Sequence, residues 1–185
     1  MKYPFIDNNL KINKSINYKN RGLLFESMIN DSNNYYLYNN IALIYKRTTP
    51  IKIINTDPSN KLISKAVFEK DSTTDYNGVY KGRYIDFEAK ETISKTSFPL
   101  SNIKDHQLLH LSKVIDNGGV AFFLIYFTSL DEIYLIRAID ILNLIKEKNI
   151  KSLSLNLIRN IGFKIRKTTN ILVDYLQNIE KIFNF

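Results

Sequence analysis

Two acidic residues and one lysine in this sequence have the spacing of a hydrolytic site. Asp75 precedes the dipeptide Lys81-Gly82, and Glu88 and Lys90 follow it. Residues that favour β-strands flank the dipeptide, so a two-residue turn there predicts a hairpin. In that register Asp75 stands opposite Glu88, and Thr73 stands opposite Lys90. Because side chains on a strand repeat every two residues, all four polar groups are expected on one face.

Such a face could bind a metal ion and cleave a phosphodiester. Two carboxylates placed directly opposite each other repel, and a divalent cation between them removes that cost. Oxygen ligands from Asp75, Glu88 and Thr73 favour a hard ion, which predicts Mg2+, with Mn2+ as an expected substitute. The ion would generate hydroxide and neutralise charge on a phosphate. Lys90, two residues after Glu88, would stabilise the pentavalent transition state or help to deprotonate the attacking water.

Two other interpretations of this segment stay open. One is a solvent-facing strand whose alternating charges form surface salt bridges, the commoner meaning of so short a pattern. The other is a turn at Asn77-Gly78, which would undo the pairing of Asp75 with Glu88. The alternation of side chains favours the turn at Lys81-Gly82, because it separates an apolar set from a polar set: Ile85, Phe87 and Ala89 from Asp86, Glu88 and Lys90.

The surrounding segments predict the elements that would position these groups. Apolar residues at helical spacing predict helices, and short β-favouring runs predict strands. The stretch 61–70 has no clear core face, so it is either a protruding hairpin or an irregular excursion. The predicted order is a helix at 21–37, strands at 41–45 and 51–54, the hairpin, a helix from Ser101 or Asn102 to Asn117, strands at 120–127 and 133–137, a helix at 138–148, an irregular segment at 149–168 and a helix at 169–183. This order predicts an α/β fold with a sheet flanked by helices.

Length and charge limit what the protein can be. Its 185 residues fit one domain, expected at 20–185 after a flexible, basic N-terminal arm at 1–19. A formal net charge of +8 predicts a polyanionic partner, with nucleic acid first and an anionic membrane second. The absence of cysteine suits a reducing compartment, and the longest apolar run, 120–127, is too short to span a membrane. We therefore expect a soluble, cytoplasmic protein.

Several segments together form a pattern long enough to be specific to one protein family. They are Asn20-Arg21-Gly22, Thr73 to Gly82, Tyr84 to Thr92, Thr96-Ser97-Phe98-Pro99-Leu100 and His106-Gln107. In these segments the chain closely resembles the RecU family of Holliday junction resolvases, a branch of the restriction-endonuclease-like nucleases. The resemblance runs over nearly the whole chain from about residue 20.

The resemblance implies a specific site, fold and substrate. It implies that Thr73, Asp75, Glu88 and Gln107 contribute to a magnesium site and that Lys90 stabilises the transition state. It implies a restriction-endonuclease-like mixed β-sheet flanked by helices, with a protruding stalk at about 51–70. It further implies a homodimer that cuts four-way junction DNA by paired nicks during recombination and repair, with a recombinase as a possible partner. Two related active sites suit the near two-fold symmetry of a four-way junction.

Other candidate residues have weaker sequence support. Glu26 could reach the site as a base acting through another group, or be an ordinary surface residue, and Asp86 is a second candidate for an indirect role. His106 and His110, four apart on a helix, could chelate a transition metal, although helix packing and surface exposure are commoner roles. Candidates for phosphate contacts that do not read sequence are Arg21, Lys46, Arg47, Lys61 and Lys65.

Two alternative functions also remain open from the sequence. One is a non-catalytic architectural protein that binds junctions and recruits a recombinase, and the other is a duplex endonuclease of the same fold. The pair of opposed carboxylates argues against the first, because binding DNA does not need two such groups facing it. Comparing cleavage of a junction with cleavage of a linear duplex distinguishes a duplex endonuclease from a junction resolvase.

Overall fold

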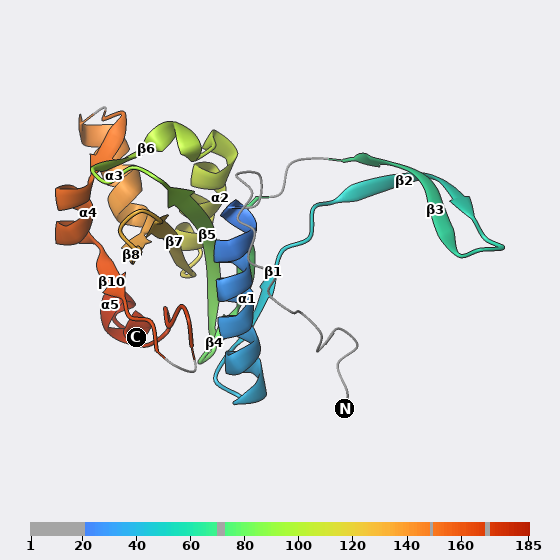
Figure 1. Ribbon diagram of the computed structural model, residues 1–185, viewed down its shortest axis with the longest axis horizontal. Helices are drawn as coiled ribbons and strands as arrows, with labels where there is room; N and C mark the ends of the chain where they lie inside the picture. Colours follow the sequence, from blue (N-terminus) through green and yellow to red (C-terminus); the bar gives the residue numbers. More distant parts are fainter. Residues whose placement is uncertain (1–20, 70–72, 149, 169–170) are drawn as a thin grey trace.

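Figure 1 shows the computed structural model, which describes residues 21–69, 73–148, 150–168 and 171–185. The predicted basic arm at 1–19 lies outside these residues. The elements follow in the order α1 (Arg21–Tyr38), β1 (Leu43–Lys46), β2 (Ile51–Asp57), β3 (Leu62–Phe68), β4 (Tyr76–Tyr80), β5 (Arg83–Thr92), β6 (Ser97–Pro99), the short 3-10 helix η2 (Leu100–Asn102), α2 (Asp105–Asp116), β7 (Val120–Phe127), β8 (Glu132–Arg137), α3 (Ala138–Lys148), β9 (Ser152–Ser154), α4 (Leu155–Ile161), β10 (Phe163–Ile165) and α5 (Ile179–Phe183).

Six of the strands form one mixed sheet at the centre of the molecule. Their order is β1-β4-β5-β7-β8-β10; β5 and β7 run parallel, and the other neighbouring pairs are antiparallel. α2, α3 and α4 cover one face, and α1 with the C-terminal segment covers the other. The predicted α/β fold, with a mixed sheet flanked by helices, is confirmed. No described helix is both long and apolar enough to cross a membrane.

The hairpin of β4 and β5 has the register that the sequence predicts. Lys81 and Gly82 form its turn with φ values of 46° and 76°. Both residues lie in the left-handed region that a tight two-residue hairpin turn requires. Tyr76 pairs with Phe87 and Asn77 pairs with Asp86, so Asn77-Gly78 lies inside β4 and forms no turn. The alternative register is therefore wrong.

The two faces of β5 carry different chemistry, and both are buried. Ile85 and Phe87 face α1, where Phe87 stacks on Tyr76 and Phe122 with ring centroids 4.9 and 4.7 Å apart. On the α2 face, Asp86 is 0% exposed and Glu88 is 1% exposed. The interpretation as a solvent-facing strand is therefore wrong. Carboxylates so deeply buried need specific partners, because an uncompensated buried charge is strongly unfavourable.

β2 and β3 form a separate two-stranded sheet that projects away from the six-stranded sheet (Figure 1). Of the two readings of 61–70, the hairpin is the one observed, with Lys61 in its tip at a φ of 54°. Its large apolar side chains are exposed, among them Phe68 at 79%. We refer to residues 51–68 as the stalk.

The structure corrects the predicted elements in two regions near the end of the chain. Residues 149–168 were expected to be irregular, but they contain β9, α4 and β10, and Ser154 caps α4 by accepting from the Leu157 N–H. The predicted helix at 169–183 is wrong apart from α5, and residues 169–170 are not described. Tertiary contacts override the helical spacing there, because Ser32 on α1 accepts from the backbone N–H of Val173.

The helix predicted to begin at Ser101 or Asn102 also begins later. Residues 100–102 form η2, and α2 starts at Asp105. The side chain of Gln107 accepts a hydrogen bond from the backbone N–H of Lys104 at 3.0 Å, which satisfies a donor at the start of the helix. A side chain of the site, rather than the predicted serine or asparagine, thus closes the N-terminus of α2.

Candidate active site

Glu88 lies at the centre of the candidate site, buried between β5 and α2. One of its carboxylate oxygens, Oε1, accepts from Lys90 Nζ and from Gln107 Nε2, each at 2.6 Å. The other, Oε2, accepts from the backbone N–H of Asp75 at 3.1 Å. The structure thus brings together four of the predicted site residues, which arrive from three separate segments of chain.

Asp75 directly precedes β4 and is held against β5. Its Oδ2 accepts from the backbone N–H of Ala89 at 3.0 Å. This bond and the bond from Asp75 N–H to Glu88 lock the two acidic residues side by side across the hairpin. Burial, and next the charge of Asp75, raise the pKa of Glu88 to about 7, although Lys90 opposes the shift. The pair therefore holds more negative charge than its own surroundings stabilise, as expected where a cation binds.

Thr73 supplies a further observation that fits a bound cation. Its Oγ1 is buried, and within the described residues it has no hydrogen-bond partner. Buried hydroxyls are normally satisfied, so an orphaned one two residues before Asp75 fits an oxygen ligand of a metal. The described residues contain no group of three or more His, Cys, Asp or Glu placed to bind a metal. A cation here would therefore rely on two carboxylates together with neutral oxygens.

Gln107 holds a different position from a simple oxygen ligand. Its amide N–H group points at Glu88, while its amide oxygen accepts from Lys104 N–H at the start of α2. Sequence reasoning without the resemblance would have treated this glutamine as solvated, yet it is buried. In this arrangement Gln107 positions Glu88, and its role as a metal ligand stays a prediction.

A second polar cluster surrounds Asp86, on the same face of β5. Its Oδ2 accepts from Arg47 Nη2 at 2.7 Å and from the Tyr84 hydroxyl at 2.8 Å, and it lies 2.8 Å from His110 Nε2, a pairing in which the histidine donates when its proton is on Nε2. Its Oδ1 accepts from Thr74 Oγ1 at 2.5 Å. Thr74, Tyr84 and His110 were not singled out for this role. Their spacing carried a signal, because Tyr84 lies two residues before Asp86 on the strand and His110 lies one helical turn after Gln107.

The remaining predicted residues lie around this centre or on the stalk. Glu26 makes an ion pair with Lys46 beside β1, and no described hydrogen bond links it to Asp75 or Glu88. Arg47 is held by Asp86, while Lys61 and Lys65 are exposed on the stalk. Arg21 begins α1. His110 contacts Asp86, and within the described residues no group of three or more His, Cys, Asp or Glu placed to bind a metal contains His106 and His110. The contacts of the basic residues with DNA stay predictions.

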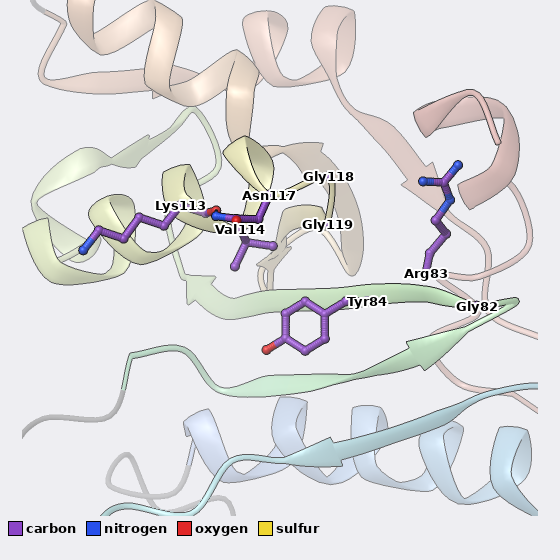
Figure 2. A pocket seen from close by; sticks show the side chains of 8 residues that line it. All are labelled: Gly82, Arg83, Tyr84, Lys113, Val114, Asn117, Gly118 and Gly119. Carbon is purple, nitrogen blue, oxygen red and sulfur yellow. The ribbon is translucent and has the colours of Figure 1, made fainter.

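An open hollow of about 520 Å3 lies further along the same face of β5, where Figure 2 shows its lining residues. Tyr84 comes from β5, whereas Val114 and the Gly118-Gly119 turn come from the end of α2. The side chains of Lys113 and Arg83 extend in opposite directions. None of the residues that contact Glu88 lines this hollow, so the hollow is separate from the carboxylate pair.

The raised pKa of Glu88 gives a stability test for the site. Its folded-state value of about 7 exceeds the ordinary 4.5, so the metal-free folded protein binds an extra proton between these pH values. Stability is therefore expected to fall by roughly 3 kcal/mol at most as pH rises from 4.5 to 7. Mg2+ should restore that stability at pH 8 and have little effect at pH 5, where protons compete for the carboxylate.

The measurement is thermal unfolding at both pH values, with and without Mg2+. The Glu88→Gln variant is the control, since it lacks the titrating group but keeps the shape. An equal response to Mg2+ in the wild type and Glu88→Gln would contradict a cation at this site.

Comparisons with known proteins agree on one family. The family model for recombination protein U, RecU, matches residues 20–181. A protein of Streptococcus mutans named Holliday junction resolvase RecU is 45% identical over 175 residues, which cover 92% of this chain and 89% of that protein. One of the same name from Oceanobacillus iheyensis is 46% identical over 172 residues, covering 90% and 88%.

A solved structure also shows a weaker likeness. It is Hjc, a Holliday junction resolvase of Archaeoglobus fulgidus, which matches 77% of this chain and 95% of its own with a TM-score of 0.45 and 10% sequence identity. The sequence comparisons show the family.

Proposed function

This chain belongs to the RecU family, and from that premise we propose that it is a magnesium-dependent endonuclease that resolves four-way DNA junctions by paired nicks during recombination and repair. Relatives at 45% and 46% identity carry the name Holliday junction resolvase. The observation that carries the proposal for this chain is the pair of half-buried Asp75 and buried Glu88, with Lys90 hydrogen-bonded to Glu88, together with the buried Thr73 hydroxyl that has no hydrogen-bond partner in the described residues.

The residues that would hold the cation are Asp75, Glu88 and Thr73. A bound Mg2+ supplies a hydroxide at neutral pH and stabilises charge on the cleaved phosphate. The N–H of Ala89 fixes Asp75, and Gln107 fixes Glu88, so both carboxylates are oriented before DNA arrives. Such preorganisation lowers the cost of reaching the transition state.

Lys90 is the group that would meet the phosphate. Its side chain is 21% exposed, whereas its partner Glu88 is 1% exposed, so the ammonium lies between the buried carboxylate and the surface. A compact ammonium group at that place suits the extra negative charge of a pentavalent phosphate. Lysine in this role needs no proton transfer, although it would also lower the pKa of a nearby water.

Charge and shape support DNA as the substrate. The net charge of +8 favours a polyanion, and Lys61 and Lys65 place positive charge on the stalk. We further propose that residues 20–185 act as one nuclease domain with the stalk at about 51–70 directed toward the junction. A homodimer would supply two sites related by two-fold symmetry, as two opposed nicks require. Mn2+ as a substitute ion, a recombinase partner and a cytoplasmic location complete the proposal.

Cleavage of an end-labelled four-way junction in Mg2+ tests this function. The expected result is a pair of symmetrically placed nicks that EDTA abolishes, with little cutting of a linear duplex of the same arm sequence. Equal cutting of the duplex would instead support a duplex endonuclease. Tight junction binding with no cutting in either Mg2+ or Mn2+ would support the architectural alternative and overturn the proposal.

A further inference from the structure

Arg47 lies where the stalk joins the six-stranded sheet. Its backbone and its side chain contact two different residues of the site. It is the first residue after β1, and β2 begins four residues later, at Ile51. Its backbone N–H donates to the carbonyl oxygen of Asp75 at 2.7 Å. Its guanidinium donates to the buried Asp86 at 2.7 Å and to the hydroxyl of Tyr84 at 3.3 Å. A single residue thus connects the root of the stalk with the segment that carries the metal ligands.

Asp86 completes the connection from the other side. Besides Arg47 it accepts from Thr74, the residue between Thr73 and Asp75, at 2.5 Å. It also accepts from His110 on α2, the helix that presents Gln107 to Glu88. A fully buried carboxylate with four donors allows little movement of any of them, because each donor lost leaves the charge less compensated.

The second leg of the stalk returns to the same place. The backbone N–H of Glu69, just after β3, donates to the carbonyl oxygen of Pro50 at 3.1 Å, which ties the two legs together at the root. From the end of β3 at Phe68, Thr73 is five residues further along the chain. Movement of the stalk root therefore reaches Asp75 through Arg47, which contacts it directly.

We propose that Arg47 and Asp86 are positioning residues that make cleavage depend on engagement of the stalk by the junction. The proposal rests on the proposed function, since it assumes junction DNA as the substrate. When DNA binds the stalk, it holds the Arg47 contacts in place, and these contacts keep Asp75 and Thr73 in the positions that the protein already gives them. On DNA that leaves the stalk empty, the same ligands are less firmly placed. Selectivity then arises in the cleavage step as well as in binding.

The same arginine could instead contact a phosphate directly, and the two roles make different predictions. Loss of a phosphate contact weakens DNA binding and lowers its salt dependence. Loss of the contacts between Arg47 and the site would leave DNA affinity unchanged and slow the cleavage of junction DNA that is already bound. The link also predicts that Arg47 and the stalk lysines act through the same step, so their effects do not add.

A double-mutant cycle on cleavage separates these roles. Single-turnover rates are measured at saturating enzyme for Arg47→Gln, for Lys61→Glu with Lys65→Glu, and for the combination. We expect Arg47→Gln to slow junction cleavage by about tenfold or more, within the usual range for coupled sites, with the junction Kd in EDTA changed by less than about threefold. Adding the stalk substitutions to Arg47→Gln should then slow cleavage little further.

Arg159→Gln is the matched control, because Arg159 also joins a carboxylate, Glu132, and a tyrosine hydroxyl, that of Tyr134, but does so on β8. It should cleave as the wild type does. If Arg47→Gln does not fold, Arg47→Lys keeps the positive charge but lacks the planar guanidinium whose Nη2 contacts both Asp86 and Tyr84. Additive losses in the cycle, or a fall in affinity that accounts for the slower cleavage, would overturn the proposal.

Hydrogen exchange in EDTA gives a second readout that needs no cleavage. Junction DNA should protect the amide of Asp75 and its neighbours more than linear duplex does at saturation, and the difference should vanish in Arg47→Gln. Equal protection by both DNAs in the wild type would refute the link. If the wild type fails to cut junctions yet shows this difference, the proposed function fails while the link stands.

Discussion

Replacing Asp75 by asparagine is expected to slow single-turnover cleavage of a four-way junction by about 1000-fold, because a metal ligand contributes several kcal/mol to transition-state stabilisation. The amide keeps the size of the side chain and can still accept from Ala89 N–H, so the hairpin should remain intact. Junction affinity in EDTA should be unchanged or slightly stronger, since one negative charge facing DNA is removed.

The same variant should be more stable than the wild type when no cation is present. The charge of Asp75 helps to raise the pKa of Glu88, so removing it relieves the repulsion between them. Cleavage, junction binding and thermal unfolding in EDTA are the three measurements. Asp140→Asn is the matched control and should cleave normally. Asp140 lies on α3 and makes an ion pair with Arg137, the last residue of β8. Cleavage by Asp75→Asn within about tenfold of wild type would remove Asp75 from the site, since tenfold is only about 1.4 kcal/mol.

Replacing Gly78 by alanine, which adds one carbon atom to β4, is expected to cause a large loss of stability. A Cβ there would lie 2.1 Å from the carbonyl oxygen of Leu43 and 2.6 Å from Cα of Ile44, both in the backbone of β1. Backbone cannot swing aside as a side chain can, so β1 must separate from β4. We expect a loss of about 3 kcal/mol, at the upper end for overpacking.

The loss should extend to cleavage, because Arg47 follows β1 directly and donates to Asp75. Val79→Ala on the same strand is the control, since Val79 is exposed and its truncation leaves no buried cavity. Denaturant unfolding and junction cleavage measure both effects. A cost for Gly78→Ala below about 1 kcal/mol would mean that β1 tolerates the extra atom and is not held closely to β4.

The sequence was sufficient for the parts of the site that depend on local geometry. A tight turn and strict alternation fix the register of β4 and β5, and the pairing of Tyr76 with Phe87 confirms it. Burial of Glu88 could not be predicted in the same way, because its cover comes from α2. Nor could the partners of Asp86, since Arg47 and His110 lie 39 and 24 residues away in the chain.

The errors near the C-terminus have a related cause. Apolar residues at 169–183 suggested a helix, but residues 171–178 follow the surface of α1 in turns, with the hydroxyl of Tyr36 donating to Asp174 at 2.9 Å. The spacing of apolar residues indicates which side chains are buried, but it does not identify the segments that they pack against. β9, α4 and β10 were missed because three-residue strands and a seven-residue helix are too short to leave a period.

The separation of the contacting residues along the chain has a consequence for how the site forms. Asp75 and Glu88 meet across 13 residues closed by a tight turn, whereas Gln107 and His110 follow later in the sequence. Short loops close at a lower entropic cost than long ones, and a chain grows from its N-terminus during synthesis. Both carboxylates are therefore synthesised before the helix that holds Glu88 in place. An unfinished chain would carry the chemical groups of a nuclease without the geometry to use them.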